Sequence, residues 1–240
     1  TFQNTIEALE DSGRPFARAT AVLHINTACL SDKAMQDVEQ QLAPILAAYQ
    51  DEIVQNESLF RRIEAIWDHR ASAQLDPDQA RLLDVLYRMF VRRGAALNAR
   101  QKIRLKEINS RLATLYTTFG QNQLADEEEQ MVILRSEADL SGLPESLIAA
   151  ARATADNKGQ KSKWVIRNTR SSVEPFLTYS TRRDLREKVW RMFAMRGDST
   201  GKHDNKPVIN EILSLRAERA SLLGFASHAH WKSDDSLAKS

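Results

Sequence analysis

His228 and His230 are the residues of this 240-residue chain whose type and spacing first suggest chemistry, because neighbouring imidazoles are common metal ligands. A zinc site on a helix usually shows H-E-x-x-H, which places both rings on one face. That pattern is missing from all five histidines, which are His24, His69, His203, His228 and His230. Residues two apart on a helix point about 200° away from each other. We therefore predict a partly exposed pair at a helix start or in a loop, with no metal ligand and no catalytic residue.

Other reactive residues also favour structural roles. No glycine-rich phosphate-binding loop occurs, which argues against a nucleotide enzyme. Cys29 falls in a helical pattern of apolar residues and is predicted to be a small core residue rather than a nucleophile. The stretch His203-Asp204-Asn205 is predicted to cap the helix that follows rather than to form a catalytic couple.

Positive charge gathers in one part of the chain. Residues 161–202 hold eleven Lys and Arg against four acidic residues, with Trp164 and Trp190 among them. Three interpretations remain open: a nucleic-acid face, a solvated helix face with pairs such as Asp184 with Lys188, and a cleft wall that attracts acidic peptide ends. The whole chain carries a net charge of only +2, so we predict no nucleic-acid partner.

Composition and periodicity predict long helices. Eight glycines and six prolines are few for 240 residues, and 42% of the residues are hydrophobic. Apolar residues recur at helical spacing along 31–53, 76–94 and 103–119, so that adjacent helices could each bury one face. Ser31 and Asp32 are predicted caps, and Asp76 before Pro77 is a strong start signal. Pro44 predicts a kink or a break near residue 43.

The pattern changes at residue 125, where ADEEEQ forms a polar break. MVIL (131–134) and KWVIR (163–167) are short apolar runs that suit two paired strands, with an alanine-rich helix between them. We predict a mainly α fold, an antiparallel bundle of long helices with a small two-stranded β element near residues 131–167. The predicted organisation is a helical bundle at 1–124, a small α/β insertion at 125–170 and a helical segment at 171–240.

Targeting signals are not evident in the sequence. No apolar run reaches the roughly 20 residues of a membrane span, and no signal peptide is visible, so we expect a cytoplasmic protein without a membrane partner. The chain does not begin with methionine, and we expect it to be a piece of a longer protein.

The stretch LRAERASLLGF (215–225), followed by SHAHW, resembles a segment of the zinc peptidases of the thimet oligopeptidase family. Further stretches resemble the same family in the same order, and the likeness is greatest to its bacterial peptidyl-dipeptidases. They include TFQNTIEALEDSG (1–13), KIRLKEINSRLATLYTTFGQN (102–122) and PFLTYSTRRDLREKVWRMFAMRG (175–197). The similarity covers essentially the whole chain.

The resemblance implies a zinc enzyme in which a motif glutamate acts as general base and the metal polarises the scissile carbonyl. Its H-E-x-x-H motif lies later in the family's chain, so no catalytic or zinc-binding residue is carried over to this sequence. The chain is then expected to be inactive alone and to form one wall of a channel for short peptides. We hypothesise that Arg182, Arg183 and Arg186 help to hold peptide carboxylates there. The absent catalytic region is the other expected partner, and self-association of the exposed apolar faces is a further expectation.

Two alternatives remain at this point. Endo-acting oligopeptidases of the same family would share this part of the chain. A stand-alone helical binding module would reuse the fold without protease chemistry.

Overall fold

A computed structural model describes residues 1–198 and 201–236 of the chain, which divides into two compact units. The first unit comprises Thr1–Thr117 together with the chain from Glu211 onward, and the second comprises Thr118–Asn210. The division falls inside two helices, α6 (Ala99–Glu129) and α10 (Lys206–Leu222). The predicted division into three parts, with boundaries at residues 124 and 170, differs from these two units and stays a prediction.

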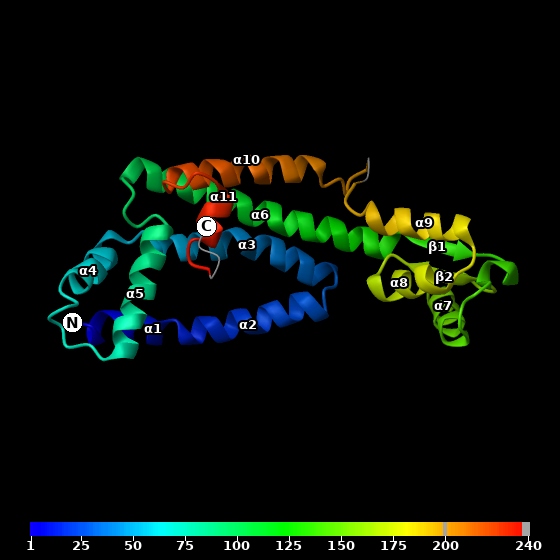
Figure 1. Cartoon of the computed structure of the whole chain (residues 1–240), viewed down its shortest axis with the longest axis horizontal. Coiled ribbons are helices and arrows are strands. Elements are labelled where there is room, and N and C mark those ends of the chain that lie inside the picture. The colour runs from blue at the N-terminus through cyan, green and yellow to red at the C-terminus, as the bar shows by residue number, and fades with distance from the viewer. Residues whose placement is uncertain (199–200, 237–240) are drawn as a thin grey trace. The chain divides into compact units, whose positions relative to one another are not determined.

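The elements of the first unit are almost entirely helical (Figure 1). Besides parts of α6 and α10 they are a π-helical turn η1 (Gln3–Glu7), α1 (Ala8–Ser12), α2 (Arg14–Cys29), α3 (Lys33–Val54), α4 (Glu57–Asp68), α5 (Pro77–Arg92) and α11 (His228–Ser233). The mainly helical fold class is thereby confirmed.

Local signals explain where several of these helices begin. The carboxylate of Asp32 accepts the Met35 N–H at 2.8 Å, as the predicted cap of α3. Asp76 forms a full capping box with Gln79 at the start of α5, and this prediction is also confirmed. Of the kink or break predicted near residue 43, the break is wrong, because α3 continues through Pro44 to Val54, and the kink stays a prediction. A proline removes one backbone donor, and the other hydrogen bonds of this long helix remain.

Two ion pairs show that α6 and α10 run antiparallel within the first unit. Arg104 on α6 binds Glu218 at 2.6 Å. About two helical turns further along α6, Arg111 binds Glu211. The pairs are partly exposed, so each adds little to stability. Buried leucine and isoleucine side chains of α6 provide the larger contribution from apolar burial: Leu105, Ile108, Leu112 and Leu115.

The core of the first unit gathers where α4 and α5 meet the N-terminal turns. Ile6, Ile63, Leu83 and Phe90 are completely buried there. The ring of Phe90 stacks on that of Phe60, with their centroids 6.3 Å apart. This packing fixes α5, whose C-terminal end leads directly to Arg93.

The second unit combines helices with the predicted strands. After the end of α6 its elements are β1 (Met131–Leu134), a 3-10 helix η2 (Glu137–Leu140), α7 (Glu145–Asn157), β2 (Trp164–Arg167), α8 (Arg170–Tyr179) and α9 (Arg183–Ala194). The strands pair antiparallel, with Met131 opposite Arg167 and Leu134 opposite Trp164. The predicted two-stranded element is confirmed, and a core around Leu134, Ile166 and Phe176 lies against it.

The polar break predicted from residue 125 is wrong, because α6 continues to Glu129. Asp126 in this stretch is 3% exposed, and its carboxylate accepts the Gly197 N–H at 2.7 Å. The side chain of Asn205 is also buried and donates to the Phe119 carbonyl at 3.1 Å, while it accepts from Asn122 at 2.8 Å. These tertiary bonds hold the turn between α9 and α10 against α6 within the second unit.

Two further points concern predicted residues. Cys29 ends α2 and is exposed, so its prediction as a core residue is wrong; α2 buries none of its residues fully. Asp204 accepts the N–H of Lys206 at 3.0 Å, so the predicted capping role near the start of α10 is confirmed for this residue. Among the described helices, none is both long and apolar enough to cross a membrane.

Candidate functional site

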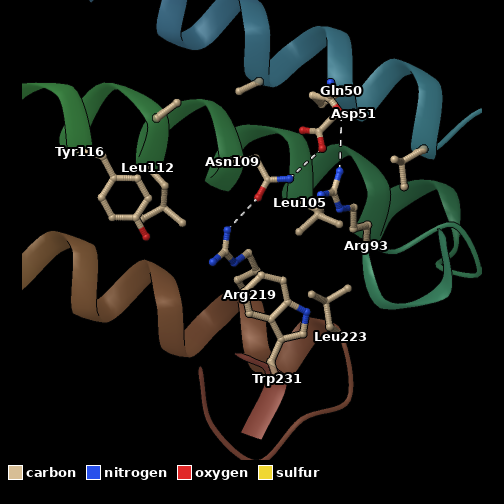
Figure 2. Close-up of a pocket in the computed structure, with 13 residues that line it drawn as sticks. Gln50, Asp51, Arg93, Leu105, Asn109, Leu112, Tyr116, Arg219, Leu223 and Trp231 are labelled. Carbon is tan, nitrogen blue, oxygen red and sulfur yellow. Dashed lines mark hydrogen bonds between the residues drawn. The ribbon is translucent and has the colours of Figure 1, made fainter. Parts of the chain in front are cut away.

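A pocket of about 280 Å³ opens in the first unit between α3, α6, α10 and α11 (Figure 2). Most of its wall is apolar, and a few polar side chains converge on it. The lining residues are Ala47, Gln50, Asp51, Val54, Arg93, Leu105, Asn109, Leu112, Ala113, Tyr116, Arg219, Leu223 and Trp231. An apolar pocket with few convergent polar groups is the usual form of a small-molecule site.

A chain of hydrogen bonds crosses this pocket. One carboxylate oxygen of Asp51 accepts from the Asn109 amide at 2.8 Å, and the Asn109 oxygen accepts from Arg219 at 3.3 Å (Figure 2). The second oxygen, Oδ2 of Asp51, is buried and has no hydrogen-bond partner in the described part of the chain. A buried acceptor without a donor costs free energy, so this oxygen disfavours the charged form of the Asp51 carboxyl group.

The charges around Asp51 are unbalanced. Burial raises the pKa of Asp51 above its usual value, against the opposing effects of Asn109, Lys106, Arg93 and Arg219. None of these cations forms an ion pair with it within 4 Å among the described residues. Arg93 instead donates to Gln50 at 3.4 Å. The pocket therefore carries excess positive charge.

Arg219 is the most confined of these cations. Its guanidinium lies over the ring of Trp231, 4.5 Å from the ring centroid. Burial lowers the pKa of Arg219, with a smaller contribution from the neighbouring cation Arg216. The indole N–H of Trp231 donates to the Arg92 carbonyl at 3.1 Å, which holds the ring in place. Stacking and desolvation fix the guanidinium at the pocket without neutralising its charge.

Replacing Asp51 by asparagine is expected to change stability in a pH-dependent way. Because its pKa is raised above 3.8, the folded chain binds this proton more tightly than the unfolded chain. Wild-type stability should then fall as the pH rises from below 3.8 through the raised pKa, and the variant lacks this loss. Urea titrations at about pH 3 and pH 7 should show the difference in unfolding free energy shifting in favour of the variant.

Asp37→Asn on the same helix is the matched control, because Asp37 is half-exposed and pairs with Lys33. A difference for Asp51→Asn that does not move with pH would contradict the raised pKa of the buried carboxylate.

The histidines lie beside this site. His228 begins α11, as predicted, and its ring contacts that of Trp231 with centroids 5.5 Å apart. Burial and nearby cations lower the pKa of His228. The hydroxyl of Ser227 lies 2.7 Å from Nδ1 of His230 and caps the helix. Glu218, which is near the two histidines in sequence, forms an ion pair with Arg104.

The three predicted arginines behave differently from one another. Arg182 binds Asp139 at 2.7 Å and Asp184 at 2.8 Å, so the predicted pair of Asp184 with Lys188 is replaced by this one. Arg183 and Arg186 are exposed on α9 and line a hollow of about 430 Å³ with Leu177, Glu187 and Trp190. Neither forms an ion pair among the described residues. The structure thus brings two of the three together.

Sequence reasoning missed the pocket residues, although a signal was present. Asn109 lies four residues after Leu105 and three before Leu112, which places a polar residue inside an apolar stripe. Asp51 lies in the same way three residues before Val54. The stretch GDSTG (197–201) also has the G-x-S-x-G spacing of a nucleophile motif. Ser199 is outside the described residues, and the preceding element is a helix rather than the strand which that motif requires.

Comparison with known proteins relates the whole chain to peptidases. Residues 176–240 match Peptidase family M3. Dipeptidyl carboxypeptidase of Escherichia coli is 35% identical over 238 residues, which are 99% of this chain and 35% of that protein. The chain belongs to peptidase family M3. Oligopeptidase A of Salmonella typhimurium is 34% identical over 232 residues, 95% of this chain and 33% of that protein. Organellar oligopeptidase A of Arabidopsis thaliana is 27% identical over 82% of this chain and 25% of that protein.

This member of peptidase family M3 spans about a third of the length of the curated relatives it matches. The zinc site implied by the family resemblance needs three or more converging His, Cys, Asp or Glu side chains. Within residues 1–198 and 201–236 no such group is present. The described residues therefore do not fit a zinc site by themselves.

Proposed function

We propose that this chain forms the N-terminal, non-catalytic part of a zinc peptidase that cleaves short peptides. Its helices would shape the channel that admits peptides, and zinc ligands would come from sequence outside these 240 residues. The observation that carries the proposal is the 35% identity to dipeptidyl carboxypeptidase, which extends along 99% of the chain. If this chain corresponds to one structural part of that relative, the similarity should extend along the whole chain, as it does.

Release of dipeptides from a free C-terminus is the activity that we propose for the full protein. The similarity to dipeptidyl carboxypeptidase of E. coli supports this choice. Endo cleavage is the alternative, and the 34% identity to Oligopeptidase A favours it nearly as much. The two reactions differ in one requirement, because only dipeptide release depends on a free carboxylate at the end of the substrate.

The basic hollow on α9 supports a role in peptide binding. Arg183 and Arg186 have no carboxylate partner among the described residues, and Trp190 beside them is 53% exposed. Guanidinium groups next to an aromatic face suit a peptide carboxylate and an apolar side chain. Arg182 stays in the proposal, although Asp139 and Asp184 already neutralise its charge.

A zinc-dependent peptidase assay tests the proposal. The substrate is an N-blocked short peptide with a free C-terminus, incubated with added zinc and with a chelator control. We expect no turnover by the 240-residue chain, and chelator-sensitive release of dipeptides by the product of the complete reading frame. In that longer product, Arg183→Glu with Arg186→Glu should raise KM while Lys161→Glu, in the same unit, should not.

Several outcomes would contradict the proposal. Chelator-sensitive turnover by the 240-residue chain would place a metal site among residues interpreted here as structural. A complete reading frame without H-E-x-x-H would instead favour a stand-alone binding module. Equal cleavage of a peptide with an amidated C-terminus would keep the zinc peptidase and select endo cleavage over dipeptide release.

A further inference from the structure

Helix α2 is exposed along its whole length and yet carries almost no charge. None of its sixteen residues is fully buried by the described part of the chain. Val22 is 60% exposed and Ile25 is 63% exposed. Residues 15–31 nevertheless contain a single charged side chain, that of Arg18, although 28% of all residues in the chain are charged. A helix with so few charged residues around its circumference is normally covered by other parts of a protein.

The neighbouring helix α3 also exposes apolar side chains. The two helices form an antiparallel hairpin, in which the ring of Phe16 near the start of α2 lies 4.6 Å from that of Tyr49 near the end of α3 (Figure 1). Val38 and Ile45 of α3 are both exposed, and their spacing of seven residues places them on one side of the helix. The α2–α3 face is defined by four exposed apolar side chains: Val22, Ile25, Val38 and Ile45.

A groove of about 320 Å³ lies between the two helices. The residues that line it come from both of them: Phe16, Thr20, His24, Leu46, Ala47 and Gln50. Helices that are fully packed leave few such gaps, because their side chains interdigitate. Side chains of a further helix fit between two neighbouring helices in this way. The hairpin therefore has the form of two helices of a bundle that other helices complete.

The chemistry of the α2–α3 face restricts what covers it. Nucleic acid is bound through several cations, and residues 15–31 offer Arg18 alone. Helices that lie on a membrane surface are rich in Lys and Arg on their polar side, which α2 is not. An apolar protein surface is the partner that matches this face.

The relatives indicate where that partner comes from. This chain covers 35% of dipeptidyl carboxypeptidase of E. coli and 33% of Oligopeptidase A of Salmonella typhimurium. We propose that the α2–α3 face docks onto an apolar helical surface of the catalytic region that lies outside these 240 residues. A partner on the same chain is favoured over a second copy, because its effective concentration is high. The existence of that region rests on the proposed function, whereas the apolar character of the face does not.

Cys29 allows the proposal to be tested without any substitution. Its thiol is exposed, and the residue lies on the same side of α2 as Val22 and Ile25, at spacings of seven and four residues. The 240-residue chain and the product of the complete reading frame are treated with N-ethylmaleimide, and alkylation of Cys29 is followed by mass spectrometry. We expect Cys29 in the longer protein to react at least about tenfold more slowly, because docking excludes the reagent.

Ile25→Glu tests whether the face is covered in the longer protein. In the 240-residue chain the new charge stays in water, so the Tm should change by no more than about 1 °C. In the longer protein the charge would be buried against an apolar surface, and the Tm should fall by at least about 4 °C. Gln40→Glu is the matched control, because Gln40 is exposed and lies about 200° around α3 from Val38. It should leave both Tm values unchanged.

Equal alkylation rates of Cys29 in the two proteins would overturn the inference, as would equal effects of Ile25→Glu on the two Tm values. Protection of Cys29 that disappears on dilution of the longer protein would assign the face to a second copy and would also overturn it. An active zinc peptidase in which Cys29 stays reactive would reject only this inference. Protection of Cys29 in a longer protein without peptidase activity would reject only the proposed function.

Discussion

Phe90→Ala is expected to lower the free energy of unfolding by about 3–5 kcal/mol. Phe90 is completely buried, and its ring stacks on that of Phe60 in the core of the first unit. The substitution removes apolar contacts and leaves a cavity that helices packed from both sides cannot fully close. Urea titration followed by circular dichroism measures the change. A loss of this size is a large share of the roughly 5–15 kcal/mol that stabilises a typical domain.

Val91→Ala is the matched control for this prediction, because Val91 is the next residue of α5 and is 37% exposed. Its effect should stay near 0.5 kcal/mol, as for most surface substitutions. The consequence of Phe90→Ala also extends to the pocket, since Arg93 directly follows the helix that Phe90 anchors. A cost below about 1 kcal/mol for Phe90→Ala would mean that α5 is not held by this core.

Asn205→Ala is expected to cost about 2–3 kcal/mol in the second unit. The Asn205 side chain is 1% exposed and bonds to the Phe119 carbonyl and the Asn122 amide. Alanine cannot replace either bond, so the Asn122 amide would lose its partner in a partly buried place and the Phe119 carbonyl would keep only its helical bond. Thermal unfolding followed by circular dichroism would show a lower Tm for the variant.

Lys202→Ala provides the comparison within the same turn. Lys202 is 76% exposed and only approaches Glu129 at 3.6 Å. Exposed ion pairs contribute roughly 0–1 kcal/mol, so its removal should leave the Tm nearly unchanged. Equal effects of the two substitutions would show that the turn is not fastened through Asn205.

Much of the fold could be predicted because its signals are local. Asp32 and Asp76 cap helices by accepting the backbone N–H three positions ahead, so a short stretch of sequence is sufficient to predict both caps. The strands at 131–134 and 164–167 are short apolar runs between polar residues, and the structure has them within one residue of the prediction. The family resemblance was likewise carried by ordered stretches of sequence, which the similarity to dipeptidyl carboxypeptidase confirms.

Predictions failed where a distant partner decides. The polar stretch from residue 125 stays helical because Asp126 binds the Gly197 backbone, 71 residues away. The predicted pair of Asp184 with Lys188 is likewise replaced, because Asp184 binds Arg182, which also binds Asp139 from 43 residues earlier. Cys29 shows the reverse case, since a helical apolar pattern predicted burial where the described residues leave it exposed.

The sequence by itself determined the helical class, the strand pair, the main helix starts and the family, because each depends on residues close together in the chain. Only the tertiary structure decided the pocket. Asn109 contacts Asp51 over 58 residues and Arg219 over 110, and no local pattern specifies such pairs. Packing buries one oxygen of the Asp51 carboxylate without a donor and leaves Arg219 without an ion pair among the described residues. Burial is a property of the packed helices and not of any segment alone.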